Sequence, residues 1–325
     1  MEACPTSSTW REKQALHPPM AGQGRGGGTR LARVDAAGGV KVVDGSILDG
    51  EPDTFRRKHR VKGISHGKKL SLKNLTFPMM GEQNEWFWSE MNMSGLTPLL
   101  TSGYENISHG FVCAMRERWH EETSNFHLPV GEMTITLDDV ACLLGIPIIG
   151  RLLSDKELTR EEALEMMQTN LLFTAEAAGK ELTRQGASHI SFGALKTRYE
   201  EILNRCNQLL VPDTEEEQEE QARVRLACIK AFMLLLIGWT IFSGKNSKNI
   251  NLFWLLALQD MDELDSWSWG GMRLAFLYEQ LSLTFDSYVA SCGGYMTLLV
   301  IIFVFLLFYL LDRKCLVVCI ILAVI

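Results

Sequence analysis

The stretch from Pro212 to Gly244 constrains the fold most, because it joins a strongly acidic run to twelve uncharged and mostly apolar residues, Ala231 to Phe242. Twelve residues are too few to cross a bilayer, which takes about 20 in a helix. Asp213 or Thr214 is suited to cap the start of a helix, and Gly244 is suited to end it. The acidic run "EEEQEE" lies at the N-terminal end, where negative charge interacts favourably with the helix dipole. The pattern predicts one long helix whose second half is buried in a core.

Apolar periodicities elsewhere predict a mainly α fold with one small β-hairpin. Side chains recur four residues apart from Ile107 through Phe111 and Met115 to Trp119, which is the spacing of one helix face. Residues 125–136 instead alternate around the turn "PVG", as the two short strands of a hairpin do. The further predicted helices lie at 84–95, 105–120, 160–170, 192–210, 253–261 and 272–283.

The segment "GEMTITLDDVACLLGIP", residues 131–147, contains two adjacent carboxylates and a cysteine. Thr136 followed three residues later by Asp139 has the spacing of a capping box, in which each side chain accepts a hydrogen bond from the other residue's backbone. Gly145 and Pro147 are suited to end the helix that this cap begins. We therefore interpret the segment as scaffold, a hairpin strand that leads into a capped helix of two turns.

The polar groups of this region do not match a known catalytic or metal-binding pattern. Asp138 and Asp139 are about 100° apart around a helix, so they do not converge on one atom. Cys113 and Cys142 need a nearby histidine to act as nucleophiles. A further polar group consists of His120, Glu121, Glu122 and His127. Its histidine spacing is not a zinc-ligand spacing, so we favour hydrogen-bonded histidines at the hairpin edge over the alternative of a metal site. No catalytic residue, metal ligand or cofactor is predicted.

Residues 1–76 form a basic arm that we expect to be disordered, because they are rich in Gly, Ser, Pro and charge and have no sustained apolar periodicity. The formal net charge of the whole chain is −7, so the rest of it is acidic. Two basic pairs, Arg56-Arg57 and Lys68-Lys69, are separated by ten residues, which is the spacing of a bipartite nuclear-import signal. The same positive charge is suited to contacts with the phosphates of nucleic acid. The alternative interpretation is a run of solvated charges without a specific function. The candidate import or nucleic-acid residues are Arg56, Arg57, Lys58, Arg60, Lys62, Lys68 and Lys69.

The residues from Tyr295 to Leu311 are 17 consecutive uncharged and almost wholly apolar residues. Asp312-Arg313-Lys314 interrupts the run, and a further apolar stretch follows. Seventeen residues is the lower limit for a membrane-spanning helix, so 295–311 is a candidate membrane anchor.

A long block from His109 to Leu153 resembles the signature of a known family. It reads "HGFVCAMRERWHEETSNFHLPVGEMTITLDDVACLLGIPIIGRLL", and "LKTRYEEILNRC", "AFMLLLIGWTIFSGKNSKNINLFWLLALQDMDELDSWSWGGMRLAFLYEQL" and "CGGYMTLL" follow in order. These blocks are similar to the plant mobile domain family, whose members are transposon-associated proteins often labelled aminotransferase-like or long-form serine/threonine phosphatase homologues. The residues of the structural signature are Trp119, Phe126, His127, Leu128, Pro129, Gly131, Glu132, Thr136, Asp139, Gly145 and Pro147.

The resemblance covers about residues 85–299 and implies a mostly helical domain at 77–299 that is truncated at its C-terminus. Family members usually continue after "GGYMTLL" with Gln and a Trp-containing helix, whereas Val300 begins the apolar tail in this chain. Residues 300–325 are therefore either part of a membrane anchor with 295–299 or a mis-spliced extension.

Neither enzymatic label of the family transfers to this chain, because the metal-ligand blocks of metallophosphatases are absent and no lysine has a recognisable cofactor setting. The resemblance implies a link to mobile elements, with some members nuclear and active in meristem maintenance, silencing and genome integrity.

We expect a non-enzymatic nuclear interaction protein that binds protein partners, with nucleic acid as a further partner of the basic arm and no small-molecule substrate. One alternative is a membrane adaptor anchored by 295–311. The other is a carboxylate- or metal-dependent enzyme, whose acidic groups would be Glu121–Glu122, Asp138–Asp139, Glu215–Glu220 and Asp260–Asp265.

Overall fold

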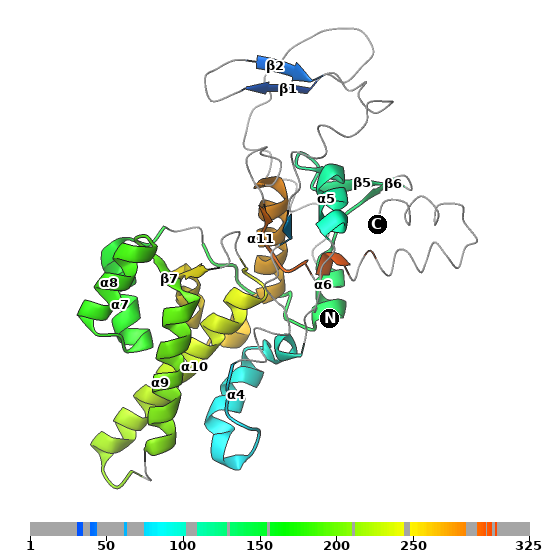
Figure 1. Ribbon diagram of the computed structural model, residues 1–325. Helices are drawn as coiled ribbons and strands as arrows, with labels where there is room; N and C mark the ends of the chain where they lie inside the picture. Colours follow the sequence, from blue (N-terminus) through cyan, green and yellow to red (C-terminus); the bar gives the residue numbers. More distant parts are fainter. Residues whose placement is uncertain are drawn as a thin grey trace. The chain divides into compact units, whose positions relative to one another are not determined.

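The computed structural model divides the chain into two units, which are described separately (Figure 1). The described residues are 31–34, 40–43, 62–63, 75–101, 109–128, 131–154, 157–209, 212–243, 248–283, 291–296, 298–300 and 303. In the first unit, Met1–Phe55, strands β1 (Leu31–Val34) and β2 (Val40–Val43) form an antiparallel pair. The second unit, Arg56–Ile325, contains the helical domain.

Most of the predicted basic arm lies outside the described residues, so its disorder and its role stay predictions. This holds for Arg56, Arg57, Lys58, Arg60, Lys68 and Lys69. Lys62 belongs to the short strand β3 (Lys62–Gly63), which pairs in parallel with β9 (Ser291–Cys292).

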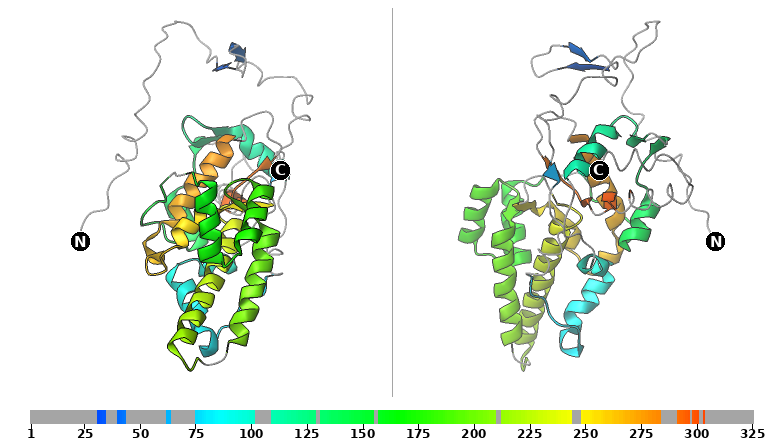
Figure 2. Two further views of the ribbon diagram at one scale, coloured as in Figure 1. Left: turned by 90° about the vertical axis from the view of Figure 1, so that its left-hand side faces the viewer. Right: turned by 45° about the vertical axis from the view of Figure 1, so that its right-hand side comes forward.

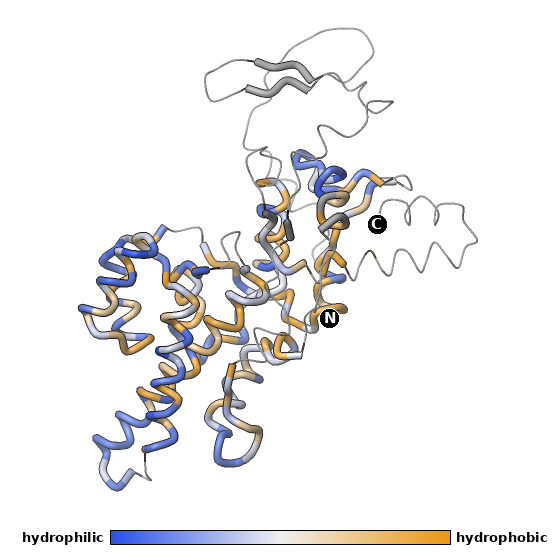
Figure 3. The backbone as a smooth tube through the Cα atoms, in the orientation of Figure 1, coloured by the Kyte–Doolittle hydropathy of each residue, from blue (hydrophilic) through white to orange (hydrophobic). Residues whose placement is uncertain are grey.

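The predicted long helix is α10 (Glu215–Trp239), and it lies beside α9 (Phe192–Gln208) in both Figure 1 and Figure 2. The hydroxyl oxygen of Thr214 accepts the backbone N–H of Glu217 at 3.2 Å, as an N-cap does. Figure 3 shows α10 passing from a hydrophilic start to a hydrophobic second half, and all residues from 227 to 239 are buried. A buried core helix is thus confirmed.

The predicted end of this helix at Gly244 is wrong. The helix ends at Trp239, because the N–H of Phe242 turns back to the carbonyl of Ile237 at 2.8 Å and takes the chain out of the helical path. Gly244 itself lies outside the described residues.

Helices α4 (Glu85–Met93) and α7 (Arg160–Leu171) pack against α10, and α8 (Ala175–Gln185) packs against α7. The α4 contact is aromatic, since the ring of Phe87 meets that of Phe232 edge to face with centroids 5.1 Å apart. The 3₁₀ turns η2 (Glu82–Asn84) and η3 (Thr97–Leu100) flank α4.

The predicted hairpin belongs to a sheet of three strands in the order β4 (Trp119–His120), β5 (Asn125–Leu128) and β6 (Gly131–Met133). The helix before it, α5, runs only over His109–Arg118, so the prediction that Trp119 continues its apolar face is wrong. Trp119 instead pairs with Phe126 across the sheet, and its indole N–H donates to the Ser282 hydroxyl at 3.1 Å.

The remaining elements complete the domain. Helix α6 (Leu137–Leu144) packs against α11 (Trp269–Leu283). Strands β7 (His189–Ser191) and β8 (Asn249–Asn251) pair antiparallel. The helix predicted at 253–261 is the tighter 3₁₀ helix η4 (Leu252–Leu258), and η5 (Leu264–Ser266) follows it.

The start of the predicted C-terminal anchor packs inside the domain, since Tyr295, Met296, Leu298 and Leu299 are buried in the core. Within the described part of the chain, no helix combines the length and the apolar character needed to span a bilayer. Most of the segment 295–311 lies outside that part.

Candidate functional site

An open cleft with a volume of about 670 Å³ lies between the β7–β8 pair, η4 and α11. Its described lining is mostly apolar and aromatic, with a smaller number of polar side chains. Leu152, on the segment after α6, and Leu283, at the end of α11, lie at the cleft with 47% and 43% of their surface exposed. Clefts of this size with apolar walls and a few polar groups are typical binding sites.

Aromatic rings from three separate segments meet in the cleft. Phe242 follows α10, Trp254 lies in η4, and Phe276 lies on α11. The rings of Phe242 and Trp254 stack with centroids 3.5 Å apart and an angle of 7° between their planes. The ring of Phe276 stands nearly perpendicular to both, at 89° and 83°. Phe253 adds a fourth ring, at 71° to Trp254. The ring of Phe276 therefore stands beside the stacked pair, with its centroid 5.6 Å from that of Phe242 and 6.2 Å from that of Trp254.

The polar lining of the cleft has acidic character. Among the described lining residues, Glu279 is the only carboxylate, and none is a lysine or an arginine. Burial lowers the pKa of His189, which favours the neutral form of its imidazole. Asn251 has a structural role as the N-cap of η4, because its side-chain oxygen accepts the N–H of Phe253 at 2.9 Å.

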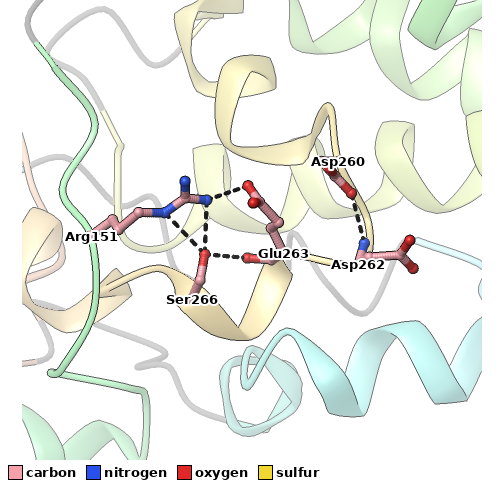
Figure 4. Close-up of polar contacts among 5 residues, drawn as sticks. All are labelled: Arg151, Asp260, Asp262, Glu263 and Ser266. Carbon is pink, nitrogen blue, oxygen red and sulfur yellow. Dashed lines mark hydrogen bonds and ion pairs between the residues drawn. The ribbon is translucent and has the colours of Figure 1, made fainter.

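One side of the cleft rests on a polar contact between the segment after α6 and the segment before α11 (Figure 4). The guanidinium of Arg151 donates to the Ser266 hydroxyl at 2.9 Å and forms an ion pair with Glu263. Its Cζ atom also lies over the ring of Trp267, 4.5 Å from the ring centroid. Arg151 thus joins three residues of one turn.

The backbones of these two segments are hydrogen-bonded as well. The N–H of Arg151 donates to the Ser266 carbonyl at 2.7 Å, and the N–H of Ser268 donates to the Arg151 carbonyl at 2.9 Å. Gly150 makes this approach feasible, since a Cβ there would lie 2.4 Å from the Ser266 carbonyl oxygen. The contact fixes Leu152 and Leu153 at the cleft.

The segment 131–147 folds as the sequence predicts. Asp139 Oδ2 accepts the backbone N–H of Thr136 at 2.8 Å, and the Thr136 hydroxyl oxygen accepts that of Asp139 at 3.2 Å, which confirms the capping box. Gly145 ends α6 in the left-handed conformation, with φ 64°. The carbonyl of Pro147 accepts the N–H of Gly270 at 2.7 Å and so ties the segment to α11.

The other signature residues shape the three-stranded sheet. Trp119 and Phe126 are buried, and Leu128 packs against the core. On the outer face, the imidazole of His127 lies 3.2 Å from the Glu132 carboxylate and stacks on the ring of His120. Gly131 begins β6, and Pro129 lies outside the described residues.

The acidic groups considered for an enzyme lie on different elements. Asp138 and Asp139 are in the first turn of α6, the Glu215–Glu220 run begins α10, and Asp260 and Asp262 lie in the turn after η4, where Asp260 accepts the N–H of Asp262 at 3.0 Å (Figure 4). In the described ranges, no three His, Cys, Asp or Glu side chains lie close enough together to hold a metal ion.

Two features of this region were not found from the sequence. The aromatic cleft draws on segments far apart in the chain, and no motif marks it. Lys230 is the second, a buried lysine on α10 whose ammonium donates to Asn170 Oδ1 and to the Gln259 carbonyl, each at 2.9 Å. Burial lowers its pKa, although the nearby Asp260 carboxylate acts in the opposite direction. Lys230 directly precedes the apolar run Ala231 to Phe242, and neither its burial nor its partners were predicted from the sequence.

The model of the plant mobile domain family matches residues 96–306. The chain belongs to this family. The match confirms the resemblance drawn from the signature block, and it spans the cleft, the Arg151 contact and the capped helix α6.

Curated relatives come from Arabidopsis thaliana. Protein MAIN-LIKE 1 is 32% identical over 193 residues, which are 58% of this chain and 35% of the relative. Protein MAINTENANCE OF MERISTEMS is 28% identical over 259 residues, 80% of this chain and 47% of the relative. A serine/threonine-protein phosphatase 7 long form homolog is 29% identical over 206 residues, 63% of this chain and 14% of the relative. The chain spans less than half the length of each of these relatives, and no solved structure matches it.

Proposed function

We propose that this plant mobile domain protein is a non-enzymatic nuclear interaction protein whose helical domain binds a segment of a partner protein in the aromatic cleft. The relative named MAINTENANCE OF MERISTEMS supports a role in meristem maintenance. The basic arm, with its import spacing and phosphate-binding charge, supports a nuclear location and contact with nucleic acid.

The cleft is the observation that carries this proposal. It is open to solvent, two of its apolar lining residues, Leu152 and Leu283, are themselves exposed, and aromatic rings also line it. Aromatic residues are enriched in the buried cores of protein interfaces, and Trp is enriched among the residues that contribute most to the binding energy. The Arg151 contact holds one edge of the cleft in place, so a partner binds a preformed surface.

Substitutions that fill the cleft test the proposal. Ala275 is exposed on α11 and lines the cleft, whereas Ala177 is exposed on α8 and does not. We would select peptides from a random displayed library on the immobilised full chain and measure their affinity for both tryptophan variants. We expect Ala275→Trp to lower the affinity for the selected peptides at least about tenfold, because the added indole would occupy the space in which a side chain of the peptide is buried.

The control variant Ala177→Trp should bind these peptides as the unmodified chain does. Equal affinity for the two variants, or a library that yields no binder, would contradict binding in the cleft.

Nuclear import is tested on the arm itself. We expect a fluorescent fusion of the full chain to lose nuclear accumulation when four basic residues are replaced by alanine, because import receptors read the paired charges. The replaced residues are Arg56, Arg57, Lys68 and Lys69. A quadruple variant that still accumulates in nuclei would refute this part of the proposal.

A further inference from the structure

We propose that Cys206 and Cys228 form an oxidation site, in which hydrogen peroxide oxidises Cys206 and Cys228 then closes a disulfide bond between α9 and α10. Neither cysteine belongs to the cleft lining, so this inference does not depend on the proposed function. It follows from the contact between the two thiols, the difference in their surroundings and the exposure of one of them.

The two thiols belong to consecutive helices that lie side by side (Figure 1). Both cysteines are free, and a hydrogen bond joins their side chains. A disulfide requires two cysteine side chains that point toward each other at close range. Because the thiols of Cys206 and Cys228 are already in contact, the sulfur atoms need to approach each other but the helices do not need to rearrange.

Other contacts join the same two helices on either side of Cys228. The ring of Tyr199 on α9 packs against that of Phe232 on α10, with centroids 5.6 Å apart. Closer to the connection between the helices, the guanidinium of Arg205 forms an ion pair with the Glu220 carboxylate. On α10, Cys228 lies between these two contacts. They hold the helix pair in the register that brings the two thiols together.

The surroundings of the two thiols differ. Cys206 is partly exposed, whereas Cys228 is fully buried. The hydrogen bond from Cys228 lowers the pKa of Cys206, although burial acts in the opposite direction, and the guanidinium groups of Arg225 and Arg205 lower it further. The same hydrogen bond, together with burial, raises the pKa of Cys228. Cys206 is therefore the thiol that ionises more readily and reaches solvent, as reactive cysteines do.

The reaction has two steps and consumes one molecule of hydrogen peroxide. The thiolate of Cys206 attacks one peroxide oxygen, the O–O bond breaks, and a sulfenic acid forms while the departing hydroxide takes up the proton that Cys206 lost. The sulfur of Cys228 then attacks the sulfur of Cys206, the S–O bond breaks, and the hydroxyl leaves as water with the Cys228 proton. Two thiols are oxidised to one disulfide, and the peroxide is reduced to two molecules of water.

The product fixes the end of α9 to the middle of α10. In the unfolded chain this bond closes a loop of about 20 residues, which favours the folded helix pair. A thiol reductant reverses the reaction by exchange.

The test uses the full chain, reduced, freed of reductant and treated with a small excess of hydrogen peroxide at pH 7. Unreacted thiols are then blocked, and tryptic peptides are identified by mass spectrometry. Trypsin cuts after Arg205, Arg223 and Arg225, so Cys206 and Cys228 fall in separate peptides. We expect these two peptides to be linked by a disulfide that a thiol reductant opens again.

The variants test the order of the two steps with a probe that labels sulfenic acids. Cys228→Ala removes the second thiol, so the sulfenic acid at Cys206 should persist and take up at least about tenfold more label than in the unmodified chain. Cys206→Ser should leave Cys228 unlabelled. Cys142→Ser is the matched control, because Cys142 is exposed but lies on α6, and it should form the Cys206–Cys228 disulfide as the unmodified chain does.

The absence of a disulfide, or one that joins Cys206 to a cysteine other than Cys228, overturns the inference. Label on Cys228 in the Cys206→Ser variant overturns it as well, because the buried thiol would then react first. The disulfide is measured on the unmodified chain, so it decides the question even if Cys228→Ala does not fold. Peptide affinity for the Ala275→Trp variant tests the cleft separately, and either proposal can fail without the other.

Discussion

Gly150→Ala is the substitution that tests most directly how the cleft is held. Gly150 has φ 139°, which side-chain-bearing residues rarely adopt. An added Cβ would lie 2.4 Å from the Ser266 carbonyl oxygen, 2.8 Å from the Ser268 nitrogen and 2.8 Å from the Trp267 carbonyl carbon. All three are backbone atoms, so no side chain can rotate out of the way. The segments must move apart.

The expected loss of stability has three sources. Holding alanine in this backbone region costs about 1–3 kcal/mol. Displacing packed backbone costs about 1–3 kcal/mol more. Two hydrogen bonds then weaken, Arg151 N–H to the Ser266 carbonyl and Ser268 N–H to the Arg151 carbonyl, each with a net value of about 1 kcal/mol. These terms overlap, because movement relieves strain as it breaks the bonds, so we expect about 3–5 kcal/mol in total.

Urea unfolding of the full chain, followed by circular dichroism, measures this loss. Gly179→Ala is the matched control, since Gly179 lies inside α8 and an added Cβ meets nothing within 4 Å. It should gain about 0.5–1 kcal/mol, because alanine is the better helix former. The two glycine-to-alanine changes should thus have opposite signs. A Gly150→Ala protein within about 0.5 kcal/mol of the unmodified chain would refute the close approach of the two segments.

Three further predictions concern stability. Thr136→Ala should cost about 1 kcal/mol in thermal or urea unfolding, because it removes the cap of α6, and it should leave peptide affinity unchanged. Burial lowers the pKa of His189, so the unfolded chain takes up its proton more readily; stability should fall as pH falls below about 6.5, and His189→Gln should show a smaller fall between pH 7.5 and 5.5. The lowered pKa of Lys230 has its effect at alkaline pH. Stability should rise as pH rises through that pKa toward 10.5, and Lys230→Met should remove this rise.

Local signals in the sequence predicted the elements that local interactions build. The acidic start and Thr214 cap of α10 and the Thr136–Asp139 capping box involve partners within a few residues, so spacing alone revealed them. The β5–β6 hairpin is local in the same sense, since its register pairs His127 with Glu132. Such contacts need no knowledge of the rest of the fold.

Elements that depend on distant partners were missed. Trp119 satisfied the helix periodicity, but its strand pairing and its bond to Ser282 decide its conformation. Helix α8 looks polar in the sequence because Glu181 lies on its buried face. That carboxylate accepts the backbone N–H of Ser191 at 2.9 Å, a contact that spacing does not reveal, and it also pairs with Arg184 one turn later on the same helix. A buried charge requires such partners, and only the fold supplies them.

The candidate site also depends on residues that are far apart in the sequence. Its walls come from segments around residues 152, 189, 250 and 276, so no short motif contains it. The two blocks that carry the family resemblance nevertheless meet beside it. A Cβ on Gly270 would lie 2.7 Å from the Ile148 side chain, and the Ser268 hydroxyl donates to the Ile148 carbonyl at 2.7 Å. The segment after the capped helix and the start of α11 therefore form one packed joint. Residues of the family signature thus form the joint that supports the cleft. The aromatic rings that line the cleft are not part of this joint. We therefore expect substitutions of these rings to change what the cleft binds and to leave the joint intact.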